Sequence, residues 1–245
     1  MKIIVSPAKQ MRMDTDSFPC RRPRFLERTA TLLEAMRSMS FQQLQELWGC
    51  NDRLASQNWE RVRHMELDRN LTPAALAYVG LQYTHMGPGV LEQQAWDYLC
   101  DNLRILSGFY GILRADDGVA CYRLEMQAPL AAGGSGSLYD FWGRSIYDEL
   151  TAQDKVILNL ASKEYSKAVE PYLEEGVRYV TCVFACGSPE KHRVKATEAK
   201  MCRGSMARWC AVHNAKRPEE VQAFDDYGYR FSAEGSDENT YLFLK

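Results

Sequence analysis

The chain lacks the features that mark membrane and secreted proteins. Its 245 residues contain no run of about 18 apolar residues, which excludes a membrane-spanning helix on length. The first apolar run ends at Ser6-Pro7 and is too short for the hydrophobic region of a secretory signal. We therefore expect a cytoplasmic protein that has no membrane partner.

The spacing of cysteine and histidine also lacks a metal or disulfide pattern. None of the eight cysteines forms a C-x-x-C pair, and none of the four histidines stands at metal-ligand spacing from them. In a reducing compartment cysteines are expected as free thiols, and here they fit small buried apolar residues. We predict no metal site, no cofactor and no disulfide, and we assign no catalytic role to a histidine.

The net charge of −2 is unevenly distributed along the chain. Residues 191–217 carry eight Lys/Arg against the single acid Glu198, a net +7, whereas residues 218–245 carry seven acids against two bases, a net −5. Such asymmetry permits a local anion-binding face on an acidic protein. A solvated helix face that is neutralised by the acidic tail explains it equally well.

The apolar periodicity predicts a single mixed α/β domain over residues 1–245, because neither a repeat nor a clear linker interrupts it. The N-terminal half is rich in helical patterns, and the buried strands that we expect would form a central mixed sheet. The predicted strands cover residues 2–5, 155–160, 179–185, 192–196, 227–231 and 241–244. The predicted helices cover residues 25–39, 41–47, 51–65, 90–103, 138–150, 163–172 and 197–214, and another starts at Thr72-Pro73.

The predicted helix over residues 197–214 has two contrasting faces. At 100° per residue, one face is apolar and the opposite face carries Lys200 and small residues around Gly204, with Arg203 and Arg208 on its flanks. A glycine inside a helix costs about 1 kcal/mol relative to alanine, which indicates that something approaches closely there. We favour a phosphate or nucleic-acid backbone. The alternative is a second helix that packs against the small residues.

The run Leu-Ser-Gly-Phe-Tyr-Gly-Ile-Leu-Arg at residues 106–114 has two interpretations. Gly108 and Gly111 could expose backbone N–H groups to a phosphate, with Arg114 as a further contact, in the first half of a helix-hairpin-helix. Alternatively, the run is a buried strand whose glycines allow helices to pack closely. A second glycine turn at residues 87–89 is a rival for the hairpin.

The segment over residues 159–167 passes from a predicted strand into a predicted helix, with Ser162 at the N-cap. Ligands of open α/β sheets bind at the carboxyl ends of the strands. Tyr165 and Lys167 are therefore expected to face a cleft shared with Ser6 and Lys9, which follow the first strand.

Five sequence blocks, at residues 1–9, 106–114, 122–126, 159–169 and 200–208, together resemble the YaaA family of bacterial peroxide-stress proteins. The resemblance implies a mixed α/β fold with a basic cleft and a helix-hairpin-helix, binding to duplex or branched DNA, and a role in limiting the free iron that feeds radical chemistry. By position it carries over these polar residues: Ser6, Lys9, Arg114, Arg123, Glu125, Lys167, Lys200, Arg203 and Arg208.

The chain departs from the family pattern at a few places. Ala115 stands where the family has proline, Gln127 replaces a glycine, and Met201-Cys202 leaves the helix one cation short. These departures predict a differently shaped loop before Tyr122 and weaker affinity for DNA than in relatives.

The leading hypothesis from sequence is a cytoplasmic DNA-binding stress protein of low sequence specificity, without an obligate protein partner. The alternative is an enzyme that acts on a nucleotide or nucleobase in the same cleft, with Glu125 and Glu164 as acid and base. An iron-sequestering scaffold ranks last, because the sequence lacks clustered ligands. The asymmetric basic segments favour a polymer ligand, and the acidic overall charge favours a small one.

Overall fold

The central sheet is built around a fully buried first strand, β1 (Lys2–Val5). The computed structural model describes residues 1–14 and 19–245. In spatial order the strands are β11 (Arg230–Phe231), β12 (Thr240–Leu244), β9 (Arg178–Gly187), β8 (Val156–Leu160), β1, β5 (Leu103–Ser107) and β6 (Gly111–Arg114), with β10 (His192–Arg193) paired to β9. Apolar side chains from both halves of the chain join one continuous core around this sheet.

The strand directions make the sheet mixed and give it a well-defined edge. β1 is parallel to β5 and β8, and β8, β9 and β12 continue the parallel set, whereas β6, β10 and β11 are antiparallel to their neighbours. The parallel strands therefore all end at the same side, which we call the carboxyl edge. The mixed α/β fold predicted from the sequence is confirmed.

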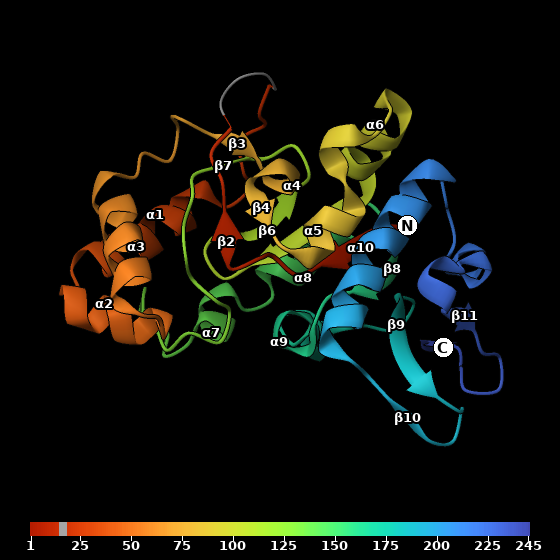
Figure 1. The fold of residues 1–245 in the computed structure, drawn as a ribbon. Coiled ribbons are helices and arrows are strands. Elements are labelled where there is room, and N and C mark those ends of the chain that lie inside the picture. The colour runs from red at the N-terminus through yellow and green to blue at the C-terminus, as the bar shows by residue number, and fades with distance from the viewer. Residues whose placement is uncertain (15–18) are drawn as a thin grey trace.

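Three amphipathic helices form the predicted helix-rich N-terminal half and gather at one end of the molecule (Figure 1). They are α1 (Leu26–Arg37), α2 (Phe41–Trp48) and α3 (Asp52–His64). The side chains of Ser40 and Asn51 accept backbone N–H groups at the starts of α2 and α3 and so satisfy donors that the helices leave free. Short elements follow: β2 (Gln10–Met11), β3 (Thr72–Pro73), α4 (Ala74–Ala77), β4 (Tyr78–Val79), α5 (Leu81–Met86), α6 (Gln93–Asn102) and β7 (Gly118–Val119).

Several predicted helices are shorter or broken. The pattern over residues 138–150 divides into α7 (Leu138–Trp142) and α8 (Ser145–Thr151) at Gly143, whose φ of +49° ends the first helix. The helix expected over residues 163–172 stops as α9 (Lys163–Ser166) and is followed by a 3₁₀ turn around Pro171, because proline has no N–H for an α-helical hydrogen bond and its ring clashes with the carbonyl four residues earlier. Two further 3₁₀ segments, Pro218–Ala223 and Asp226–Gly228, precede β11.

The glycine run at residues 106–114 is a buried turn between β5 and β6, so Gly108 and Gly111 are not available to a phosphate. A Cβ on Gly108 would lie 2.7 Å from the carbonyl oxygen of Leu124, and Gly111, at φ +74°, faces the ring of Trp142. The turn joins two strands, so the helix-hairpin-helix expected at this position is wrong. Of the alternative interpretation, the buried strands and the close approach of a helix at Gly111 are confirmed, whereas Gly108 meets the backbone of the segment at residues 124–125. The rival turn at residues 87–89 does lie between two helices, α5 and α6.

The long helix α10 (Ala196–Val212) packs its small-residue face against α5, where a ligand was expected. A Cβ on Gly204 would lie 2.0 Å from the backbone carbonyl oxygen of Gln82, so the α5 backbone is what approaches this glycine. Ala207 and Ala211, on the same side, are also buried. The prediction of a ligand-facing floor is therefore wrong, and the alternative of a packed helix is confirmed.

None of the eight cysteines, all of which lie among the described residues, forms a disulfide. Among the described residues, no cluster of three or more histidine, cysteine, aspartate or glutamate side chains is arranged to hold a metal ion. No helix in this part of the chain has the length and apolar character needed to cross a membrane.

Replacing Gly204 by alanine tests the contact between α10 and α5. The new methyl group would meet the Gln82 carbonyl, so Gly204→Ala should lower the free energy of unfolding by about 1–3 kcal/mol despite the gain in helix propensity. Gly136→Ala, in an exposed loop with open space around it, is the matched control and should leave stability unchanged. Urea denaturation measures both. A Gly204→Ala protein as stable as the wild type would contradict the close contact.

Candidate functional site

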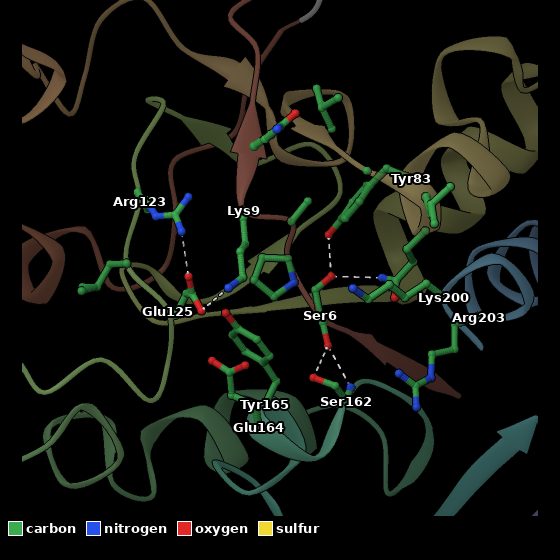
Figure 2. Close-up of a pocket in the computed structure, with 18 of the residues that line it drawn as sticks. Ser6, Lys9, Tyr83, Arg123, Glu125, Ser162, Glu164, Tyr165, Lys200 and Arg203 are labelled. Atoms are coloured by element: carbon green, nitrogen blue, oxygen red, sulfur yellow. Dashed lines mark hydrogen bonds and ion pairs between the residues drawn. The ribbon is translucent and has the colours of Figure 1, made fainter. Parts of the chain in front are cut away.

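Ser6, the first residue after β1, connects three elements at the carboxyl edge. Its backbone carbonyl accepts hydrogen bonds from Gln82 Nε2 at 3.0 Å and from Tyr83 Oη at 2.9 Å, both on α5. Its hydroxyl accepts the backbone N–H of Ser162 at 2.8 Å and donates to the Ser162 hydroxyl at 3.1 Å. Figure 2 shows Ser6 at the centre of these interactions. Ser6 thus fixes α5 and the start of α9 relative to the sheet.

A cavity of about 340 Å³ opens around Ser6. It is lined by residues that follow β1 and β8, by the start of α5, by the segment at residues 122–125 and by the first half of α10. Seven of the polar residues singled out from sequence meet there: Ser6, Lys9, Arg123, Glu125, Glu164, Lys200 and Arg203. The expected cleft at the carboxyl ends of the strands is therefore present, and Tyr165 lines it as expected.

Glu125 links two of the cations in the cavity. One carboxylate oxygen lies 2.9 Å from Lys9 Nζ, and the other lies 3.3 Å from a terminal nitrogen of Arg123. The side chains of Arg123 and Glu125 are only 10% and 19% exposed, whereas that of Lys9 is 65% exposed. The carboxylate therefore neutralises a buried arginine and holds the flexible lysine at the mouth of the cavity.

Glu164 is the second carboxylate in the cavity. Burial raises its pKa above the ordinary value for glutamate, and the nearby charge of Glu125 raises it further. The backbone N–H of Gln127 lies 3.4 Å from one Glu164 oxygen, and Tyr139 donates its hydroxyl to the Glu164 backbone carbonyl. Two carboxyl groups in different environments thus share the cavity, an arrangement that acid–base chemistry also uses.

Lys200 and Arg203 supply the positive charge on the α10 side. Lys200 is exposed and forms no ion pair with any described residue. Arg203 is half-buried, and burial lowers the pKa of its guanidinium. The buried Nε atoms of Arg203 and Arg123 both lack a hydrogen-bond partner within the described chain. The two arginines lie on opposite sides of the cavity in Figure 2 and are not saturated by the protein itself.

Besides Gly108 and Gly111, three predicted site cations lie outside the cavity. Arg208 donates to the carbonyls of Met86 and Gly87 at 3.4 Å each and so caps the carboxyl end of α5. Lys167 is exposed on the solvent side of the turn after α9 and does not line the cavity. Arg114 ends β6 at the opposite edge of the sheet, because β6 is antiparallel to β5. The cations of α10 therefore lie outside the close contact between its small residues and α5.

Sequence reasoning missed the α5 side of the site. Gln82 and Tyr83 are buried and line the cavity, but α5 has only six residues, too few for an apolar period to be recognised. Tyr122 was noted only as part of a motif. Its hydroxyl lies within hydrogen-bond distance of Tyr78 and Ser107 hydroxyls, at 2.7 and 2.6 Å, and burial raises its pKa to about 12. The phenol of Tyr122 therefore lines the cavity in its neutral form.

The arrangement suits the binding of an oxyanion better than nucleophilic catalysis. The described lining offers lysine and arginine donors around a serine pair and contains no histidine or cysteine. Arginine and lysine form their strongest hydrogen bonds with anionic oxygens such as those of phosphate.

Comparison with known proteins identifies the family of this chain. Residues 1–235 match the family model described as peroxide stress protein YaaA. The chain is 46% identical over its full length to a UPF0246 protein of Lachnoclostridium phytofermentans, with 96% of that protein covered. It is 47% identical to one of Desulfitobacterium hafniense and 46% identical to one of Lactobacillus johnsonii, each covered to 98%. The chain belongs to the YaaA family of peroxide stress proteins.

Proposed function

We propose that this protein binds DNA, duplex or branched, in the cytoplasm through the carboxyl edge of its sheet, and thereby helps to limit iron-driven damage during peroxide stress. The observation that carries the proposal is the pair of cations on the α10 side of the cavity, Lys200 and Arg203, which form no ion pair with any described residue. Hydrogen bonds from such cations to phosphate oxygens are about twice as strong as those between neutral groups. A phosphate oxygen would supply the missing negative charge.

The basic surface extends beyond the cavity along the same edge. Because β1, β8 and β9 are parallel, the segments that follow them emerge side by side. Their cations, together with those at the start of α10, are Lys9, Lys163, Lys167, Lys191, Arg193, Lys195, Lys200 and Arg203. Such a row matches a repeated phosphate backbone better than a single small anion.

Part of this row is free to bind an anion. Glu170 pairs with Lys163 and Glu198 pairs with Lys195. Within residues 1–14 and 19–245, by contrast, no ion pair is formed by four exposed cations: Lys167, Lys191, Arg193 and Lys200. We therefore include Lys167 among the proposed DNA contacts, on the part of the carboxyl edge that lies outside the cavity. Because these contacts are to the backbone, we expect low sequence specificity.

We place the hairpin contact implied by the family at the turn over residues 87–89. This turn follows α5, which also lines the cavity, and Arg208 holds its backbone by donating a hydrogen bond to the Gly87 carbonyl. Gly89 is exposed and Val90 is 77% exposed, so the turn is open to a partner. A glycine turn between helices is a common contact with a phosphate backbone.

The second candidate function is an enzyme that acts on a nucleotide or nucleobase. It is favoured by the size of the cavity, about 340 Å³, which falls in the range of small-ligand sites. It is also favoured by Glu164, whose raised pKa suits a group that gives or takes a proton.

Salt dependence tests the DNA-binding proposal. The logarithm of the binding constant should fall linearly with the logarithm of salt concentration, by about 0.9 per phosphate contact. Lys200→Ala and Arg203→Ala should each make the slope shallower by about 0.9, since each removes one contact. Fluorescence anisotropy with a labelled duplex and a branched junction gives the slopes.

The control for this experiment is Lys155→Ala. Lys155 is exposed just before β8, at the opposite edge of the sheet, and it carries the same charge. Its removal should leave the slope unchanged. If Lys155→Ala alters the slope as much as Lys200→Ala does, binding depends on net charge and the carboxyl edge is not the interface.

Glu125→Gln separates the two candidate functions. If the carboxylate is structural, its loss leaves Arg123 buried without a charged partner, and the free energy of unfolding should fall by about 1–3 kcal/mol. Glu190→Gln, an exposed carboxylate that bonds only Ser188 in the described chain, should change stability by less than about 0.5 kcal/mol. Chemical denaturation measures both variants.

The same variant is then assayed for turnover. Wild type and Glu125→Gln are incubated with nucleotides, nucleosides and damaged duplexes, and products are separated by chromatography. We expect no turnover in either protein. Wild-type turnover that disappears in a Glu125→Gln protein of normal stability would replace the binding function by the enzymatic one.

A further inference from the structure

A second cavity lies at the amino edge of the sheet, away from the proposed DNA surface. Its volume is about 140 Å³, less than half that of the first cavity. It is lined by the paired ends of β5 and β6, by the segment before α1 and by α8. Its charged lining consists of Arg21, Arg22, Arg24, Arg104, Arg114, Asp117 and Glu149.

Two of these arginines face each other across the β5–β6 ladder. Arg104 and Arg114 are direct partners in the register, so their side chains leave the same face of the hairpin. Arg104 is only 6% exposed, and burial lowers its pKa, with the charge of Arg114 lowering it further. Like charges that are directly opposed destabilise a sheet. Neither arginine of this pair forms an ion pair with a described residue that would offset the repulsion.

The acids near the cavity offset this positive charge only in part: burial and Arg114 lower the pKa of Arg104 by more than Asp117, Glu149 and Asp101 raise it. Asp116 pairs with Arg21 at 2.8 Å, and Glu149 pairs with Arg24 at 3.1 Å. Asp117 accepts the backbone N–H of Arg114, and burial raises its pKa to about 7, so its carboxyl group is only partly ionised at neutral pH.

The hydrogen bonds of the two arginines leave donors available. One terminal nitrogen of Arg104 donates hydrogen bonds to the backbone carbonyls of Cys100 and Leu103. No ion pair within residues 1–14 and 19–245 involves Arg104 or Arg114. Guanidinium groups held side by side with free donors form the strongest hydrogen bonds with planar or tetrahedral oxyanions.

We propose that this cavity is a binding site for a single phosphate group, either inorganic phosphate or the terminal phosphate of a small ester, held between Arg104 and Arg114. The small volume, about 140 Å³, admits one such group and is less than half that of the first cavity. Arg22 and Arg24, on the segment that closes the cavity, would screen the bound anion from solvent. The site is independent of DNA binding, because it opens at the other edge of the sheet.

The test measures phosphate binding to the full chain by isothermal titration calorimetry, with sodium chloride at matched ionic strength as the reference. Arg114→Met should weaken phosphate binding at least about tenfold, since one charge-assisted contact is lost. Arg53→Met, an exposed arginine on α3, is the control and should bind phosphate like the wild type. Glycerol phosphate in place of inorganic phosphate identifies the source of the group.

Thermal unfolding gives an independent readout. Phosphate should raise the melting temperature of the wild type but not of Arg114→Met, as expected for a ligand that binds only the folded state. Without phosphate, Arg114→Met should be at least as stable as the wild type, because the opposed charges are relieved. If Arg114→Met does not fold, Arg114→Lys, which keeps the charge but loses the planar fork, should show weaker phosphate binding instead.

Two results would overturn the proposal. One is a wild type that binds neither phosphate nor its ester more strongly than chloride. The other is equal phosphate affinity in the wild type and both Arg114 variants, which would assign the binding to the first cavity. Lys200→Ala separates this site from the proposed function: it should lose DNA affinity and keep the phosphate response, whereas Arg114→Met should show the reverse.

Discussion

The contact between Gly204 on α10 and the backbone of Gln82 on α5 is the constraint on which the candidate site depends. It brings α10 close enough for Lys200 and Arg203 to line the cavity. The same residue of α5 donates its side-chain amide to Ser6 and so ties that helix to the end of β1. One close backbone approach thus sets the distance between the sheet and the cations of the long helix.

The cavity combines charges that would otherwise repel or be costly to bury. Glu125 neutralises Arg123 and positions Lys9, which leaves Lys200 and Arg203 on the other side as cations without a carboxylate partner in the described chain. Binding of an anion is therefore favoured on the α10 side, while the Glu125 side is already compensated. We therefore expect a phosphate backbone to enter the cavity from the α10 side.

The sequence could predict the elements that strong patterns mark. The strand β1, the amphipathic helices α2 and α3 and the long helix α10 all appear where expected. The cleft was predictable because strand ends in parallel sheets converge. What covers the small face of α10 was not, since glycine and alanine accommodate a helix backbone and a ligand equally well.

The positions of Arg114 and Lys167 were not predictable for a different reason. The edge at which Arg114 lies depends on β6 being antiparallel to β5, a pairing between segments that local patterns do not specify. The direction of Lys167 depends on where α9 ends, and Pro171 ends it early. The family motifs thus mark these polar residues as one set, whereas the tertiary fold divides them between two edges of the sheet.

The central claim, that the carboxyl edge binds the DNA backbone, is tested most directly by lysine footprinting. The protein is acetylated with and without a saturating DNA duplex, and modification of each lysine is measured by mass spectrometry. The account predicts protection of Lys9, Lys167, Lys191 and Lys200, with Lys155 and Lys216 modified equally in both states. Protection of Lys155 with no change at Lys200 would contradict it.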